Sequence, residues 1–458
     1  MKILVVGGGS GGHITPAIAV IREILAKKQR ARIEFWTDRK YYKNVVKITT
    51  LGKEGGDLPI RVRKVWSGKF RRYAGWSFLD YFRNFKITFV DLICKNIVGF
   101  FGFLGGIIQS FFRLIDKKER PDVIFLKGGF VGLPVGIVAK MFKIPYVIHE
   151  SDATPGLANR VLMKKAKVVG MGVKFDKEVP GRENWEWVGI PIGDEFRKVS
   201  LPKQISLKRS FGFDTKMPLT VITGGSQGSE HINQVVQQVL PELLKNTSVG
   251  LVAGRKHYEQ MVELKKFEKW EDAELVSNFR MWEFNSNMDE LLGAADIVVS
   301  RAGATTIAEL SALEKAVILI PFEKLPGGHQ VKNAERLEKL GAAMMIRDDE
   351  MVEKPEKLVE AVRELVKKPA KRKGIASKLN EEAKLDSAER LAEIIIKVGN
   401  EAGRKRIEKE SSGRRADFDC EAGLGCGAGL GRGAGKNGGL SGKANRGENR
   451  GGKDGRSR

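Results

Sequence analysis

The sequence predicts an α/β protein with two Rossmann-like domains that face a cleft. Short apolar runs alternate with helical patterns from residue 1 to 398, the alternation falls into two similar halves, and each half opens with a strand and a glycine-rich turn. This alternation is typical of β-α units with parallel strands, which bind ligands at the carboxyl ends of the strands. The length of 458 residues also favours more than one domain.

Apolar runs mark the expected strands. The first sheet is expected to contain residues 1–7, 31–37, 121–128, 145–150 and 166–172, and the second sheet residues 218–225, 248–254, 296–303 and 316–322. We place the first domain at 1–185, the second domain at 186–365, and helices that pack back towards the first domain at 366–398. Residues 176–205 lack periodicity and contain three prolines, which is typical of an interdomain linker.

Charge and composition exclude several classes of protein. Lys and Arg number 80 against 56 Asp and Glu, a net charge of +24, and 42% of the residues are hydrophobic. These values suit a soluble protein with a basic surface and exclude a polytopic membrane protein. The three cysteines have no zinc or disulfide spacing, and the chain starts without a signal-like leader, so we expect a reducing, cytosolic compartment.

The last segment, residues 399–458, is predicted to be disordered. It contains 17 glycines in 60 positions, and 14 basic residues against 8 acidic ones. Such a segment buries too little apolar area to offset its chain entropy. Its Arg-Gly pairs could contact nucleic acid, but we interpret it as a solvated tail and expect no specific nucleic-acid partner.

The turn after the first strand, residues 7–13, reads GGGSGGH and leads into a helix start. Glycines let a backbone approach a phosphate closely, and the amides and dipole of a helix start attract it. The turn also contains a literal G-x-G-x-x-G, and Asp38 follows the second strand, so a nicotinamide-dependent dehydrogenase is an alternative. His13 lies at the mouth of the turn, and an imidazole with an ordinary pKa of about 6.5 can take a proton from a hydroxyl.

The second half repeats this arrangement at residues 223–228, TGGSQG, and a third glycine turn occupies residues 127–134. One turn suffices for the pyrophosphate of a dehydrogenase, whereas two facing turns suit transfer between a donor diphosphate and a second phosphorylated partner. Any one of these turns could be a tight packing turn. Together they favour a transferase.

A further helix start follows at residues 300–309, SRAGATTIAE. Thr306 and Glu309 are three residues apart and lie on nearly the same face. Glu309 could accept both hydroxyls of a ribose, or it could pair with Thr306 in a capping box, and both interpretations remain open. His149 ends an apolar strand and is expected to be a core group. The histidines have no metal-ligand spacing, so we expect neither a metal nor a cofactor.

Taken in order, the motifs resemble the peptidoglycan N-acetylglucosaminyltransferase family, MurG, over residues 1–398. The matching segments are GGGSGGHITPA, SGKFRRY, KGGFVGLPV, HESDATPGLANR, GGSQGSEHINQ, SRAGATTIAEL and HQVKNAERL. The resemblance implies the GT-B fold and metal-independent, inverting transfer of N-acetylglucosamine from UDP-N-acetylglucosamine to the 4-hydroxyl of N-acetylmuramic acid in lipid I. The product would be lipid II. Another GT-B glycolipid glycosyltransferase is the second alternative.

Carried over by position, the resemblance assigns residues to the site. His13 is the candidate base, and Asp152 is a sugar-hydroxyl acceptor where many members carry asparagine. The other donor-side residues that it implies are Ser10, Gly11, Gly12, Ser226, Gln227, Ala304, Thr305, Thr306, Glu309 and Gln330, with Gly128 and Gly129 on the acceptor side. Gly193 stands where many members carry an arginine, and Arg197 could replace that arginine.

The family also implies contact with the inner leaflet of the bacterial cytoplasmic membrane, at its cytoplasmic face. A cationic and aromatic edge for an anionic bilayer is offered by Lys69, Arg71, Arg72 and Tyr73. Residues 96–112 add 17 uncharged positions with four glycines, too short to favour spanning. We expect peripheral association through the surface around 69–112, with a buried helix of the first domain as the alternative.

Overall fold

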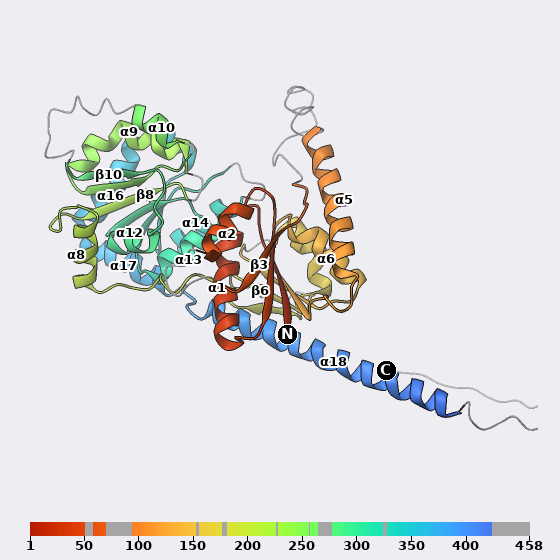
Figure 1. The fold of residues 1–458 in the computed structure, drawn as a ribbon. Coiled ribbons are helices and arrows are strands. Elements are labelled where there is room, and N and C mark those ends of the chain that lie inside the picture. Colours follow the sequence, from red (N-terminus) through yellow and green to blue (C-terminus); the bar gives the residue numbers. More distant parts are fainter. Residues whose placement is uncertain are drawn as a thin grey trace, which may run out of the picture. The chain divides into compact units, whose positions relative to one another are not determined.

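The computed structural model describes residues 1–50, 58–69, 94–152, 155–175, 181–225, 228–255, 257–263, 277–323 and 328–423. Residues 1–405 form one compact unit, and residues 406–458 are a separate unit. The larger unit contains two parallel sheets with helices on their faces (Figure 1). The predicted α/β class with two Rossmann-like domains is confirmed.

Seven parallel strands form the first sheet, in the order β3-β2-β1-β4-β5-β6-β7. Their bounds are Lys2–Val6 (β1), Arg32–Thr37 (β2), Ile60–Lys64 (β3), Val123–Leu126 (β4), Tyr146–Glu150 (β5), Val168–Met171 (β6) and Trp185–Trp187 (β7). The accompanying helices are Gly11–Lys27 (α1), Tyr42–Thr50 (α2), Lys95–Leu114 (α5), Gly132–Met141 (α6), Leu157–Leu162 (α7) and the short Met163–Lys165 (η2). The strand order reverses between β1 and β4, where ligands bind in such sheets.

Six parallel strands form the second sheet, in the order β10-β9-β8-β11-β12-β13. Their bounds are Leu219–Thr223 (β8), Ser248–Val252 (β9), Phe279–Trp282 (β10), Ile297–Ser300 (β11), Ala316–Leu319 (β12) and Met344–Met345 (β13). Around it lie Leu201–Ser210 (α8), Glu230–Leu244 (α9), Tyr258–Glu263 (α10), Met288–Ala294 (α12), Ala304–Ala312 (α13), His329–Lys339 (α14), Asp348–Glu353 (α15), Glu356–Lys367 (α16) and Pro369–Asn380 (α17). The last helix is Ser387–Gly423 (α18).

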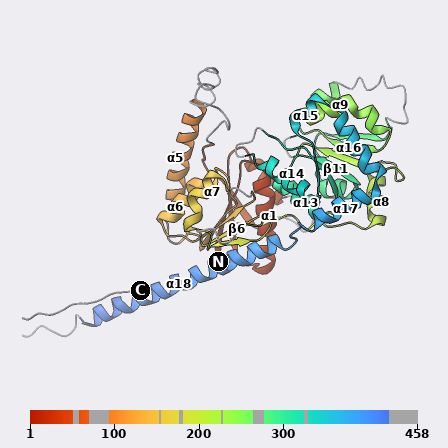
Figure 2. The same ribbon diagram turned by 180° about the vertical axis from the view of Figure 1, so that it is seen from behind.

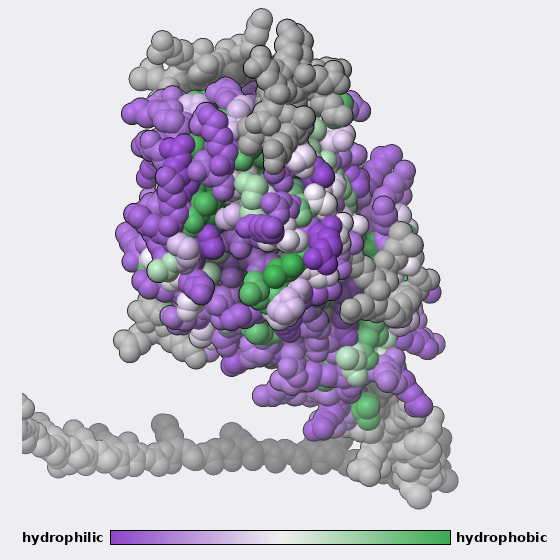
Figure 3. Space-filling model, turned by 90° about the vertical axis from the view of Figure 1, so that its left-hand side faces the viewer, coloured by the Kyte–Doolittle hydropathy of each residue, from purple (hydrophilic) through white to green (hydrophobic). Residues whose placement is uncertain are grey.

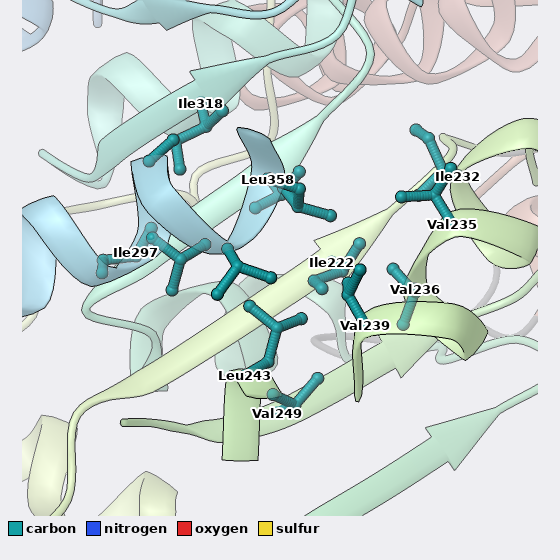
Figure 4. Close-up of a cluster of buried hydrophobic side chains, with 14 of the residues drawn as sticks. Ile222, Ile232, Val235, Val236, Val239, Leu243, Val249, Ile297, Ile318 and Leu358 are labelled. Atoms are coloured by element: carbon teal, nitrogen blue, oxygen red, sulfur yellow. The ribbon is translucent and has the colours of Figure 1, made fainter. Parts of the chain in front are cut away.

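Alternating side chains of each strand reach opposite faces of the sheet, and both faces are apolar. On β8, Val221 belongs to one buried cluster and Ile222 to the other. Figure 4 shows Ile222 among side chains of α9 and α16. Full burial of one such side chain stabilises the fold by roughly 1.5–3 kcal/mol. Because both faces of the sheet are buried, the strands appear in the sequence as continuous apolar runs.

After the second domain the chain returns to the first. Leu391, Ile395 and Val398 of α18 join the buried cluster formed by β1, β2 and α1. The helix then continues to Gly423, so residues 399–423, which were predicted to be disordered, are helical because Glu, Ala, Lys and Arg there favour a helix. Residues 424–458 lie outside the described part. The segment predicted as linker contains β7, which pairs with β6.

Helix α5 lies beside α6 (Figures 1 and 2). Its glycines let the preceding segment approach, since a Cβ at Gly99 would lie 3.1 Å from the Lys69 carbonyl oxygen. Within the described ranges it is the one helix long and apolar enough to cross a membrane, with mean hydropathy 1.6 and 22% of its window buried. By contrast, hydrophilic residues dominate the face of the second domain in Figure 3, where hydrophobic residues form small separate groups.

Candidate functional site at the ends of two glycine turns

The first glycine turn connects β1 to α1 and leaves a helix start open. Ser10 is the N-cap in an extended conformation, and among the described residues its side chain caps no amide. The first amides of α1, at Gly11 and Gly12, therefore have no intrahelical partner and can meet an anion. Gly9 has φ +82°, and a Cβ there would lie 2.7 Å from the Phe130 ring, so the turn requires glycine.

Asp38 holds this turn in place. Its Oδ1 accepts a hydrogen bond from the Gly9 amide over 2.9 Å, and a Cβ at Gly8 would lie 2.4 Å from the same oxygen. The carboxylate is 8% exposed. A dinucleotide fold needs this acid free for a ribose, so the arrangement removes the main support for the dehydrogenase alternative.

His13 lies in the first turn of α1 with its two ring nitrogens in different surroundings. Nε2 faces the third glycine turn, where a Cβ at Gly129 would lie 3.3 Å away. Nδ1 is buried and has no hydrogen-bond partner within the described residues. The pKa of His13 is lowered to about 4, mainly by burial and to a smaller extent by the nearby Lys127 ammonium. A hydrogen bond to the Lys127 backbone raises this pKa and offsets part of the decrease. The imidazole is neutral at pH 7 and is a weaker base than its ordinary pKa predicts.

The segment after β5 is organised by Glu150. Its carboxylate accepts hydrogen bonds from the Asp152 amide (3.1 Å), the Gly156 amide (2.9 Å) and Asn159 Nδ2 (2.9 Å). His149 is a buried core group, as expected, and its Nε2 donates to the Gly189 carbonyl over 2.8 Å. Glu150 therefore shapes the loop that carries Asp152.

Asp152 is presented towards the second domain. Burial and the Glu150 carboxylate raise the pKa of Asp152, while His329 and Lys127 lower it. His329 is the first residue of α14 in the second domain. The side chain of Asp152 is therefore close enough to both domains for their charges to act on it.

On the donor side, α13 begins at Ala304 after the N-cap Gly303, which has no side chain to offer. Thr306 is the third residue of the helix, so the capping-box interpretation is wrong and the amides of Ala304, Thr305 and Thr306 start an open helix. A Cβ at Gly12 would lie 3.4 Å from Thr305 Oγ1. The starts of α1 and α13 thus face each other.

Glu309 lies one turn further along α13. Burial, and next the carboxylate of Glu195, raise the pKa of Glu309 to about 8. At neutral pH this carboxyl group is largely protonated. At the start of α14, Gln330 Oε1 accepts a hydrogen bond from the Phe322 amide over 2.9 Å.

The guanidinium of Arg197 pairs with Asp194 over 2.7 Å, and its charge acts on Glu23 of α1. The replacement of the phosphate-binding arginine by Arg197 stays a prediction, because part of the second glycine turn lies outside the described ranges. Several other predicted residues lie outside the described ranges, namely Ser226, Gln227, Arg71, Arg72 and Tyr73. Lys69 is described and is exposed.

Sequence reasoning missed a buried polar network behind the donor side. Arg301 donates to Asp348 Oδ1 (2.6 Å) and to Ser229 Oγ (2.5 Å), and His231 Nδ1 lies 2.8 Å from Asp348 Oδ2. The network joins the end of β11 to the N-cap of α9, which follows the second glycine turn. Three segments far apart in the chain supply these groups, and no spacing signal connects them.

Comparison with known proteins agrees with this arrangement. Residues 3–171 match the glycosyltransferase family 28 N-terminal domain, and residues 219–391 match the glycosyltransferase family 28 C-terminal domain. A protein of Thermoanaerobacter sp. (strain X514) is 34% identical over 405 residues, 87% of this chain and 100% of its own length. It is named UDP-N-acetylglucosamine--N-acetylmuramyl-(pentapeptide) pyrophosphoryl-undecaprenol N-acetylglucosamine transferase. This chain belongs to the MurG family.

Other members and structures are consistent with MurG membership. A Bacillus cereus (strain ATCC 10987 / NRS 248) protein with the same name, numbered 2, is 32% identical over 80% of this chain and 91% of its own length. The crystal structure of Acinetobacter baumannii MurG has the same fold, with a TM-score of 0.59 at 20% identity over 86% of this chain and 99% of that one. The predicted GT-B fold is therefore confirmed.

Proposed function

We propose that this protein transfers N-acetylglucosamine from UDP-N-acetylglucosamine to the 4-hydroxyl of N-acetylmuramic acid in lipid I, which gives lipid II. The observation that carries the proposal is the 34% identity to a transferase of this name over that protein's whole length. The facing starts of α1 and α13 support it, because a transfer between two anionic substrates needs two adjacent anion sites.

The second domain holds the donor in this proposal. Ser226 and Gln227 bind the diphosphate, as the resemblance implies, and the open amides at the start of α13 meet it from the helix end. Glu309 accepts hydrogen bonds from the ribose hydroxyls, and Gln330 binds the sugar. As the sugar leaves, the helix dipole and the amides stabilise the negative charge that develops on UDP.

The first domain supplies the acceptor and the base. His13 accepts the proton of the 4-hydroxyl while the hydroxyl oxygen bonds to the anomeric carbon and the bond to UDP breaks. Attack from the face opposite UDP inverts the anomeric configuration. Asp152 accepts a hydrogen bond from a sugar hydroxyl, and the Gly128–Gly129 turn supports the imidazole from the Nε2 side.

The membrane-bound acceptor requires a surface that meets the inner leaflet, and we assign this to α5 at the cytoplasmic face. Apolar side chains on this helix are exposed: Ile97 50%, Val98 71%, Phe100 47%, Phe101 65%, Ile108 58% and Phe112 71%. An isolated patch of this kind is typical of an interfacial helix. Its buried face packs on α6, which favours a helix lying in the interface over one crossing the bilayer.

The test is incubation of the purified protein with UDP-N-acetylglucosamine and lipid I in anionic vesicles, with mass spectrometry of the lipid product. The expected product is the disaccharide lipid. No product with lipid I but transfer to a diacylglycerol acceptor would favour the glycolipid alternative. A thermal shift with NADH and none with UDP would favour a dehydrogenase.

A further inference from the structure

Lys127 is a buried charge inside the candidate site that the proposed reaction does not yet use. It follows β4, it is 1% exposed, and its ammonium donates a hydrogen bond to Ser151 Oγ over 2.8 Å. Lysine is almost never buried this completely unless its charge is paired or used, because desolvation of an ammonium group costs several kcal/mol.

Charged and titratable groups face Lys127 from each element around it. His13 faces it from α1, His149 and Glu150 from β5, and Asp152 from the loop after β5. Burial lowers the pKa of Lys127 to about 8 while the two carboxylates raise it, so the ammonium is mostly charged at neutral pH. Glu150 already accepts three hydrogen bonds from other groups. The Lys127 ammonium instead donates its hydrogen bond to Ser151, in the Ser151–Asp152 turn.

We propose that Lys127 is a positioning residue for the transfer reaction: it fixes the Ser151–Asp152 turn beside the acceptor and places a positive charge behind His13. The positive charge favours the ionised form of Asp152, which accepts a sugar hydroxyl, and it lowers the pKa of His13. The inference rests on the proposed function, and it assigns a role to a side chain that acts only through its neighbours.

The chain offers a matched control for a test by Lys127→Met. Lys315 is also buried, at 6% exposure, and its ammonium donates to the carbonyls of Gly293 (2.8 Å) and Ala295 (3.0 Å). Burial also lowers the pKa of Lys315 to about 8. Lys315→Met therefore removes a similar ammonium from the second domain, away from the acceptor turn. It shows how much stability the protein loses when any buried lysine is replaced by methionine.

Two kinetic results are expected. Lys127→Met lowers kcat about tenfold or more at pH 7 with the KM for UDP-N-acetylglucosamine changed less than about twofold, since the residue holds the acceptor turn in place. The acidic limb of the kcat profile at saturating donor, which reports His13 in the complex, moves up by about one pH unit. Lys315→Met changes neither quantity. If both variants lose stability alike and keep the wild-type pH profile, the proposal is overturned.

A second measurement needs no turnover. The protein has five histidines, so NMR titration of histidine-labelled protein, assigned with His13→Gln, gives the pKa of His13 directly. We expect Lys127→Met to raise it by about one unit and Lys315→Met to leave it unchanged; an unchanged value in Lys127→Met refutes the inference. A wild-type protein that makes no lipid II would refute the proposed function instead.

Should Lys127→Met fail to fold, Ser151→Ala decides the question, because it removes only the acceptor of the 2.8 Å hydrogen bond. We expect kcat to fall roughly three- to tenfold, as for the loss of one neutral partner of a charged hydrogen bond. A Ser151→Ala variant with wild-type kcat would show that Lys127 is merely structural.

Discussion

Binding of UDP is expected to release a proton from Glu309. Burial and the Glu195 carboxylate raise the pKa of this group to about 8. The ionised carboxylate accepts both ribose hydroxyls, and these hydrogen bonds lower the pKa in the complex. The free protein therefore binds more protons than the complex below about pH 8, so the affinity for UDP should rise with pH up to about 8 and then level off.

The magnitude follows from this pKa. Each pH unit below 8 costs 1.36 kcal/mol, so UDP should bind about tenfold more weakly at pH 7 than on the plateau. Glu309→Gln should lose about 2 kcal/mol of plateau affinity, the usual contribution of a hydrogen bond to a charged group, and should lose the pH dependence that the ribose contact causes.

Isothermal titration calorimetry in two buffers of different ionisation enthalpy measures both the affinity and the proton release. Dideoxy-UDP, which lacks the 2′ and 3′ hydroxyls, is the matched ligand, because it keeps the diphosphate and its own titration. In the wild type, the difference in affinity between UDP and dideoxy-UDP should depend on pH. In Glu309→Gln this pH dependence should be absent. An equal difference in both proteins would refute the ribose assignment.

Three further outcomes are expected. His13→Ala should lower kcat by about 10²- to 10⁴-fold with UDP affinity within about twofold, which stopped-flow turnover and calorimetry measure; normal turnover would assign the base elsewhere. Asp38→Ala should lower the free energy of unfolding by about 1–3 kcal/mol in urea titration, because the buried Gly9 amide loses its acceptor, and an unchanged midpoint would contradict that role. Phe101→Glu with Phe112→Glu should abolish flotation with anionic vesicles while activity on a soluble acceptor persists; undiminished flotation would assign the membrane surface elsewhere.

Much of the fold could be predicted from hydrophobic patterning, and all nine predicted strands are present. The four missed strands lie at sheet edges or are very short. Ile60–Lys64 (β3) reads IRVRK and Met344–Met345 (β13) has two residues, so neither has the apolar run that marks a strand buried on both faces. Edge strands tolerate charge, and periodicity alone does not find them.

The site could be predicted less completely. Glycine turns before helices have a local signature, and His13 and Glu309 are found from their place in such motifs. The contact of Lys127 with Ser151 and that of Arg301 with Asp348 depend on which buried charges the sheet brings together. The low pKa of His13 depends on the same packing, and residue spacing contains no information about it.

The return of α18 to the first domain has a consequence for biosynthesis. The side chains of Leu391, Ile395 and Val398 complete a hydrophobic layer begun by residues 3–24. When only the first 185 residues have left the ribosome, part of this hydrophobic layer is therefore exposed to solvent. It stays exposed until nearly 400 residues have been translated. A chaperone that shields this face, or rapid docking of the late helix, would protect the nascent chain from aggregation.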